Sequence, residues 1–242
     1  MKQFNIRTVT RRDALYMGLF SLAGLKAGEL ILRADALPTE ASGGIGDYGA
    51  YLRAVPSKSS GPARTSEPFV PTEDNILGPF YRSGAPFRAK ITPPLEPGNV
   101  VVVTGRIWGY DSKKPVSNVT IDVWQANAKG RYDNDDPANP PKKGVYLNRA
   151  RLVTDENGYY EFETIHPGQY QIGPNVWRPS HIHYMVACPG YKQLVTQLYF
   201  EGDPHNKTDQ FIKHSLIRSF HKVKVGASSY EAATFDIVLA RS

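Results

Sequence analysis

The sequence predicts an all-β fold, with an antiparallel β-sandwich core, long functional loops and little helix. The chain has 21 Gly and 19 Pro among 242 residues, which exceeds ordinary usage and favours many turns over long helices. From residue 100 onward, Val, Ile, Tyr, Phe and Thr recur in short runs with a period of two, as they do in strands. Only Thr208 to Phe220 shows a helical spacing of apolar residues. Together these observations predict a sandwich rather than a helical bundle.

Six expected strands follow one another along the chain, and each is bounded by Gly, Pro, Asn or Asp. Between two of them, Asp155 to Gly158 contains the strong turn dipeptide Asn-Gly. The expected strands are Val100 to Trp108, Val119 to Trp124, Tyr159 to Thr164, His181 to Ala187, Leu194 to Phe200 and Thr234 to Leu239.

The net charge of +6 and the pI near 9.3 bring a nucleic acid into question as a partner. Half of this charge belongs to residues 1–36, which hold six Lys or Arg and three acidic residues. The other basic runs, Lys142-Lys143 and Lys222 to Lys224, are short and isolated, which is typical of solvated loops. We therefore predict no nucleic-acid partner.

Two further classes of protein are excluded by composition. The single cysteine, Cys188, excludes a disulfide framework within the chain and a cysteine-based zinc cluster. No apolar run reaches the length of about 18 residues that a membrane-spanning helix needs. We expect no stable membrane span in the mature protein.

The N-terminal region has the features of an export signal. Basic residues precede the apolar run Ala14 to Leu25, and Ala34-Asp35-Ala36 follows as a small-residue cleavage site. Arg11-Arg12 resembles the twin-arginine motif of folded exported proteins. We therefore expect a signal over residues 1–36 and a periplasmic or secreted protein. The alternative is an amphipathic N-terminal helix on a cytoplasmic protein. Residues 37–71, rich in Ser, Gly, Pro, Ala and Thr, predict a flexible or extended arm.

Candidate metal ligands lie in the strand that begins at His181. Strand alternation places His181 and His183 on one face and Ile182 on the other, and paired imidazoles are common metal ligands. Such pairs are also often surface or hydrogen-bonded core residues, and we find no acidic residue at a persuasive spacing to complete a site. Tyr132 and Tyr170 lie nearby in sequence. A phenol has a pKa near 10, so only a strongly Lewis-acidic ion such as Fe(III) would hold it ionised at neutral pH.

Five blocks of sequence together resemble the intradiol ring-cleavage dioxygenases, in the order that this family shows. The resemblance runs from about Glu73 to Leu239, and it implies a catalytic β-sandwich domain over residues 72–242. It also implies one mononuclear non-haem Fe(III) per chain, held by two Tyr, two His and a water-derived hydroxide. The blocks are Leu77 to Tyr81, Asp122 to Asn127, Gly130 to Tyr132, Trp177 to His183 and Thr196 to Asp203.

The resemblance assigns roles to individual residues of this chain. Tyr132 and His181 match the equatorial ligands, and Tyr170 and His183 match the axial ligands. Tyr170 would also leave the metal and accept a proton from the substrate. Arg178 matches the family's active-site arginine, and the alternative for it is a surface salt-bridge partner. Gln197 matches a glutamine that lines the same pocket, and the alternative for it is a strand residue that faces water. The substrate pocket would begin at Leu77, Pro79 and Tyr81.

The implied activity is the insertion of both atoms of O2 into a small aromatic diol. The ring would break between its two hydroxylated carbons and give a cis,cis-muconate-type product. The substrate stays open among catechol, protocatechuate, hydroxyquinol and substituted catechols. Gln171 and Ile172 follow Tyr170 where protocatechuate-cleaving relatives carry a Trp, which argues against protocatechuate. The oligomeric state is open too, with a homo-oligomer among the options. The alternative function is a non-catalytic β-sandwich binding module, which oxygen uptake with catechol would exclude.

Overall fold

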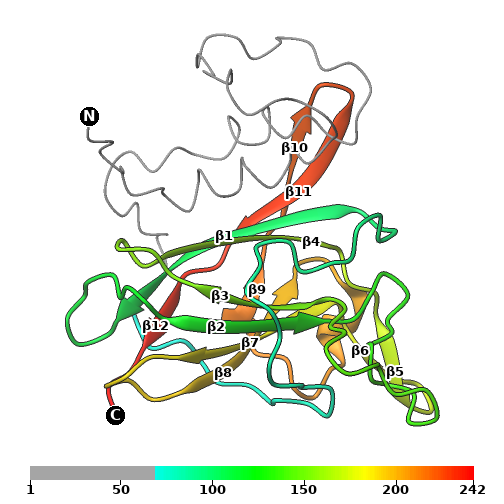
Figure 1. Ribbon diagram of the computed structural model, residues 1–242, viewed down its shortest axis with the longest axis horizontal. Helices are drawn as coiled ribbons and strands as arrows, with labels where there is room; N and C mark the ends of the chain where they lie inside the picture. Colours follow the sequence, from blue (N-terminus) through cyan, green and yellow to red (C-terminus); the bar gives the residue numbers. More distant parts are fainter. Residues whose placement is uncertain (1–68) are drawn as a thin grey trace, which may run out of the picture. The chain divides into compact units, whose positions relative to one another are not determined.

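The computed structural model describes residues 69–242, which form β-strands and loops with two short 3-10 helices (Figure 1). The all-β prediction is confirmed. The expected signal over residues 1–36 lies outside the described residues, as does nearly all of the arm over residues 37–71, so both stay predictions. No helix within residues 69–242 is long and apolar enough to cross a membrane.

Two five-stranded sheets form the body of the fold. In the first sheet, β10 (His221–Val225), β11 (Ser228–Thr234), β1 (Val100–Gly109) and β12 (Ile237–Leu239) lie in that order, and β4 (Tyr159–Ile165) also pairs with β1. The second sheet has the order β3 (Arg149–Val153), β2 (Thr120–Gln125), β7 (His181–Ala187), β8 (Leu194–Phe200) and β9 (Ile217–Arg218).

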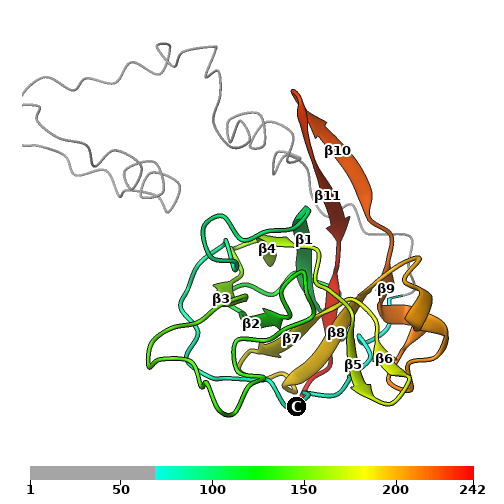
Figure 2. The same cartoon turned by 90° about the vertical axis from the view of Figure 1, so that its right-hand side faces the viewer.

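A separate hairpin lies at one end of the second sheet (Figures 1 and 2). It consists of β5 (Tyr170–Gly173) and β6 (Val176–Arg178), which, among the strands of residues 69–242, pair only with each other. The 3-10 helices η1 (Pro204–Lys207) and η2 (His214–Leu216) follow β8 in the chain. The hairpin directly precedes β7, so its position influences how the chain enters that central strand.

The packing of β7 explains why a short polar-apolar run becomes a central strand. Ile182, Tyr184 and Val186 are fully buried in the core between the sheets, where they meet residues of the first sheet such as Phe162 and Ile237. His181 and His183 therefore point to the other face of the second sheet, as strand alternation predicts. Both faces of β7 are buried, one by the sandwich core and the other by the groups around the two histidines.

Two of the expected elements differ in the structure, and β3, β5, β6, β9 and β10 were not expected from the sequence. The helical spacing of Thr208 to Phe220 does not produce an α-helix, because Asp209 Oδ1 accepts a hydrogen bond from the Phe211 backbone N–H and the chain then turns into β9. The strand expected over Thr234 to Leu239 is divided between β11 and β12. Both of these strands pair with β1 in parallel, so the sandwich is not purely antiparallel.

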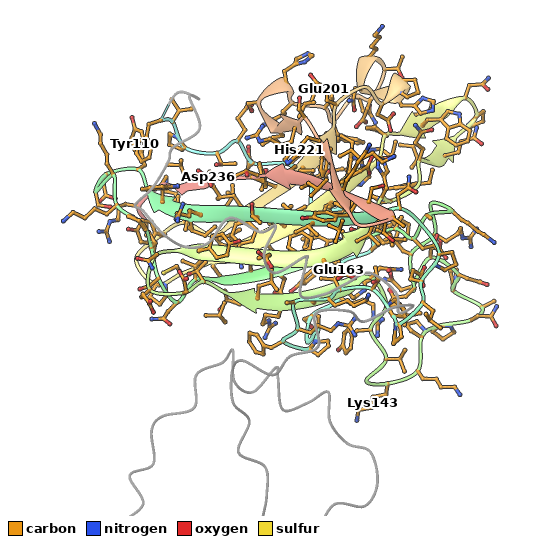
Figure 3. The ribbon with its side chains drawn as sticks, turned by 90° about the horizontal axis from the view of Figure 1, so that it is seen from above. Tyr110, Lys143, Glu163, Glu201, His221 and Asp236 are labelled. Atoms are coloured by element: carbon orange, nitrogen blue, oxygen red, sulfur yellow. The ribbon has the colours of Figure 1, made fainter. Side chains whose placement is uncertain are left out.

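Charged side chains ring the outside of the fold. Figure 3 shows Lys143 on a loop that projects away from the sheets, and Lys142 and Lys143 are both exposed. Lys222 and Lys224 are exposed as well, on the edge strand β10. Lysines on an edge strand discourage pairing with other chains.

Candidate active site

The candidate site lies on the face of the second sheet that is turned away from the sandwich core. Strand register places Trp124 on β2 and Gln197 on β8 beside His183, and Tyr199 beside His181. The central row of the sheet therefore carries Trp124, His183 and Gln197 across three neighbouring strands. All three side chains are almost fully buried.

The structure brings together the four residues that the sequence predicted as metal ligands. The Nε2 atoms of His181 and His183 are 3.2 Å apart, and the Tyr132 hydroxyl is 3.4 Å from His181 Nε2. The ring of Tyr170 is perpendicular to that of Tyr132, with 5.6 Å between centroids, and its centroid is 5.7 Å from that of His181. Two imidazole nitrogens and two phenol groups thus surround one point, although they come from three separate segments of the chain.

Burial keeps these four groups uncharged in the absence of a bound cation. Desolvation, and after it the positive charge of Arg178, lowers the pKa of His181 to about 3. Desolvation and the neighbouring His181 lower the pKa of His183 well below its usual range. Burial also raises the pKa of both Tyr132 and Tyr170. The histidines therefore present neutral imidazoles, and the phenols need a nearby cation to ionise.

The donor set fits a hard, strongly Lewis-acidic metal ion. His181 Nδ1 donates a hydrogen bond to the Pro179 carbonyl at 2.6 Å, so the proton is on Nδ1 and Nε2 has a free lone pair. Within residues 69–242, no cluster of three or more His, Cys, Asp or Glu side chains could hold a metal ion. A metal at this place must therefore use the tyrosine oxygens, and phenolate oxygens are ligands suited to Fe(III).

Arg178 and Gln197 are also at the site. Arg178 lies directly across the β5–β6 hairpin from Tyr170 and is buried. Its Nη2 donates to Gln197 Oε1 at 2.7 Å and to the Tyr199 hydroxyl at 3.3 Å. The amide nitrogen of Gln197 in turn donates to the carbonyl of Ile76 at 2.9 Å.

The segment from Ile76 to Phe80 closes one side of the site, but not with all of the residues that we expected. Leu77 and Pro79 are exposed beside it. The Tyr81 hydroxyl donates to Asp122 and its ring packs on Trp124, and its place in the substrate pocket stays a prediction. The neighbouring Phe80 is the aromatic residue that reaches the site.

Phe80 stacks on Tyr132 with 4.3 Å between centroids, and its edge meets the Tyr170 ring. Gly78 has a positive φ of 71°, and a Cβ atom there would lie 3.3 Å from His183 Cε1. These contacts join segments more than fifty residues apart, so local sequence patterns do not reveal them.

Two further contacts were not expected from the sequence. Trp124 stacks on His183, with centroids 4.7 Å apart and planes within 5° of parallel. Asp203 Oδ2 accepts hydrogen bonds from Gln169 Nε2 and from the Ser180 backbone N–H, both at 2.9 Å. Because Gln169 precedes β5 and Ser180 follows β6, one carboxylate ties both ends of the hairpin. Both Trp124 and Asp203 lie within sequence blocks that we had singled out, but those blocks do not show which atoms they contact.

Comparisons with known proteins agree on one family. A family model described as "Dioxygenase" matches residues 76–241. The chain is 34% identical to chlorocatechol 1,2-dioxygenase of Rhodococcus opacus over 189 residues, which is 69% of this chain and 72% of that protein. It is 39% identical to the protocatechuate 3,4-dioxygenase beta chain of Burkholderia cepacia over 209 residues, or 80% and 87% of the two chains. Among solved structures, 3-chlorocatechol 1,2-dioxygenase from Rhodococcus opacus 1CP superposes with a TM-score of 0.65 at 29% identity, covering 71% of this chain and 74% of that one.

Proposed function

The chain belongs to the intradiol ring-cleavage dioxygenase family, and we propose that it cleaves a catechol-type diol at one Fe(III) held by Tyr132, Tyr170, His181 and His183. The observation that carries the proposal is the convergence of the two Nε2 atoms and the two phenol groups in a buried place. Within residues 69–242 no group of three or more His, Cys, Asp or Glu side chains offers an alternative metal site.

Charge balance supports this assignment. Fe(III) with two tyrosinates and one hydroxide is neutral, so the filled site would bury no large uncompensated charge. When bound, the ion would stabilise the ionised phenols and make the electron-rich diol reactive toward O2. A catechol bound as a dianion in place of the hydroxide and of one tyrosinate would leave the site neutral again.

The two tyrosines are held differently, which supports different roles. Tyr132 is only 5% exposed and is stacked against Phe80. Tyr170 is half-buried at the start of the β5–β6 hairpin. We assign to the Tyr170 oxygen the acceptance of one of the two substrate protons, because this ring has more room to move. Tyr132 keeps its position and its negative charge.

Arg178 would stabilise negative charge that develops on the substrate. Its Nη1 donates to no acceptor within residues 69–242. This nitrogen is also not fully enclosed by protein atoms. It is therefore the part of the guanidinium that a ligand can reach. Preorganised cationic donors of this kind act most strongly in a site that excludes water.

The overall reaction adds both atoms of O2 to the diol. The bond between the two hydroxylated carbons breaks and each of these carbons becomes a carboxyl carbon, so that catechol gives cis,cis-muconic acid with no other reactant or product. The identity of the ring substituents is left to experiment, because relatives with different named substrates match the chain.

The test is oxygen uptake by the iron-loaded protein with catechol, protocatechuate, hydroxyquinol and methyl- or chlorocatechols. We expect uptake with at least one diol, incorporation of both labelled atoms from 18O2 into a diacid, about one iron per chain and a broad visible tyrosinate-to-iron absorption. Iron-loaded protein without colour would refute the two-tyrosine site. Binding of diols without any oxygen uptake would favour the non-catalytic binding module instead.

A further inference from the structure

The guanidinium of Arg178 is held by three different acceptors. Nε donates to Asp209 Oδ2 at 3.2 Å, and Nη2 donates to Gln197 Oε1 and to the Tyr199 hydroxyl. Three fixed hydrogen bonds leave a planar guanidinium little freedom to rotate. The remaining nitrogen, Nη1, is therefore held in one direction.

Asp209 is the only one of these acceptors that carries a charge. The side chains of Arg178 and Asp209 are 3% and 1% exposed, so the pair is shielded from solvent. A buried cation without a counter-charge would be strongly unfavourable. The carboxylate thus keeps a charged arginine beside the two histidines and two tyrosines.

Asp209 also shapes the surroundings of Arg178. Its second oxygen, Oδ1, accepts the backbone N–H of Phe211 at 3.2 Å. The Phe211 ring in turn faces the guanidinium, with 4.9 Å between its centroid and Arg178 Cζ. The carbonyl of Phe211 accepts a hydrogen bond from Asn75 Nδ2 at 2.9 Å. One carboxylate therefore holds both the edge of the guanidinium and the ring against its face.

From these contacts we propose that Asp209 is a positioning residue, which holds Arg178 so that Nη1 points toward the bound diol. That Nη1 acts on a diol rests on the proposed function. The Asp209–Arg178 contact does not depend on it. Asp209 does not touch the substrate in this scheme. It acts through Arg178, and its removal should leave the metal ligands in place.

The first test replaces the carboxylate by the amide of the same shape. In Asp209→Asn we expect a roughly 10- to 100-fold lower kcat, as for other groups that orient active-site residues. We expect a smaller change in KM for catechol and an unchanged iron content. Asp111→Asn is the matched control, because it breaks an aspartate–arginine pair on the surface. Wild-type kcat in Asp209→Asn would overturn the proposal.

The second test asks whether Asp209 holds a guanidinium that is no longer attached to the chain. In Arg178→Ala, millimolar guanidinium chloride should restore part of the activity and raise the melting temperature, relative to sodium chloride at equal concentration. In Arg178→Ala/Asp209→Asn it should do neither. Equal rescue of both variants would overturn the proposal, whereas a loss of stability alone would not produce this difference.

Two further results would also decide the proposal: failure of Asp209→Asn to fold, and absence of oxygen uptake by the wild-type chain. If Asp209→Asn does not fold, Asp209→Glu keeps the charge but displaces it, and it should lower kcat with the iron content unchanged; wild-type kcat in that variant would count against positioning. If the wild-type chain consumes no O2 with any diol, the proposed function fails. The guanidinium-dependent melting temperature would still show whether Asp209 holds the cation.

Discussion

The Nε2 atoms of His181 and His183 face each other at 3.2 Å, yet the two imidazoles are supported in different ways. His181 is fixed by a hydrogen bond from Nδ1 to the Pro179 carbonyl. Within residues 69–242, His183 Nδ1 has no hydrogen-bond partner. This ring is held by its stack on Trp124, and it lies close to Gly78, where an added Cβ would be 3.3 Å from Cε1. The position of His183 should therefore be sensitive to packing, and that of His181 to its hydrogen bond.

Gly78→Ala tests the packing around His183. The added methyl group would lie 3.3 Å from His183 Cε1, so we expect the imidazole to shift and the affinity for iron to fall roughly tenfold or more. Iron content after dialysis against a chelator measures this. Gly144→Ala is the control, because Gly144 has a similar positive φ of 79° but no atom of residues 69–242 within 4 Å of the added Cβ. Both variants carry the backbone strain of about 1–2 kcal/mol, so equal iron retention would contradict the contact with His183.

Replacing each tyrosine separately should separate their roles. Tyr132→Phe removes the oxygen of a proposed ligand that is buried and stacked on Phe80, so we expect a large loss of iron. Tyr170→Phe should shift the visible absorption and slow the proton transfer that follows catechol binding, while most of the iron is retained. Stopped-flow absorbance without O2, together with metal analysis, measures both effects. Complete loss of iron in Tyr170→Phe would argue against its role as a dissociating ligand.

Asp203→Ala should loosen the β5–β6 hairpin at both ends. The substitution removes the acceptor of Gln169 Nε2, of Ser180 N–H and of the His205 N–H. Partly buried donors left without a partner cost about 1–3 kcal/mol, which urea unfolding of the variant would show. Hydrogen exchange across residues 169–180 should become faster. Asp136→Ala is the control, since Asp136 makes comparable bonds within an exposed loop, and equal exchange in the two variants would refute the special role of Asp203.

The stability of the protein should fall at alkaline pH. Burial raises the pKa of Tyr184 in the folded protein, so above pH ~10 the unfolded chain loses this proton while the folded chain keeps it. The contribution of protonated Tyr184 to the free energy of unfolding is fully present below pH ~10. Above that pH it decreases by up to about 1.4 kcal/mol per pH unit. Tyr184→Phe should make this decrease shallower, as measured by urea unfolding between pH 8 and pH ~11. Parallel curves for the two proteins would show that Tyr184 does not contribute.

Strand alternation was sufficient to place several residues of the site. The period-two pattern around Ile182 correctly separates the two histidines from the core, because burial on both sides of β7 fixes which face each residue takes. The same reasoning fails for Thr208 to Phe220, where Asp209 bonds to the Phe211 backbone and ends the helical periodicity. Local hydrogen bonds by short polar side chains compete with helix formation in this way.

Contacts between distant segments could not be predicted from the sequence. Phe80, and not Tyr81, meets Tyr132, because the loop after Ile76 is anchored through the Gln197 amide, 121 residues away. The roles of Asp203 and Asp209 have the same origin. A carboxylate in a loop shows no periodic signal, and its partners appear only once the hairpin and the sheet have been brought together.

The β5–β6 hairpin also has a consequence for how such enzymes diversify. Tyr170 and Arg178 are opposite each other at its base, and Asp203 fixes both ends of the chain there. Insertions or deletions at the tip, around Pro174 and Asn175, can therefore accumulate over evolution without shifting either residue. The exposed Ile172 and Val176 lie on this tolerant part of the hairpin. Natural variation in substrate range should concentrate there, while the base stays invariant.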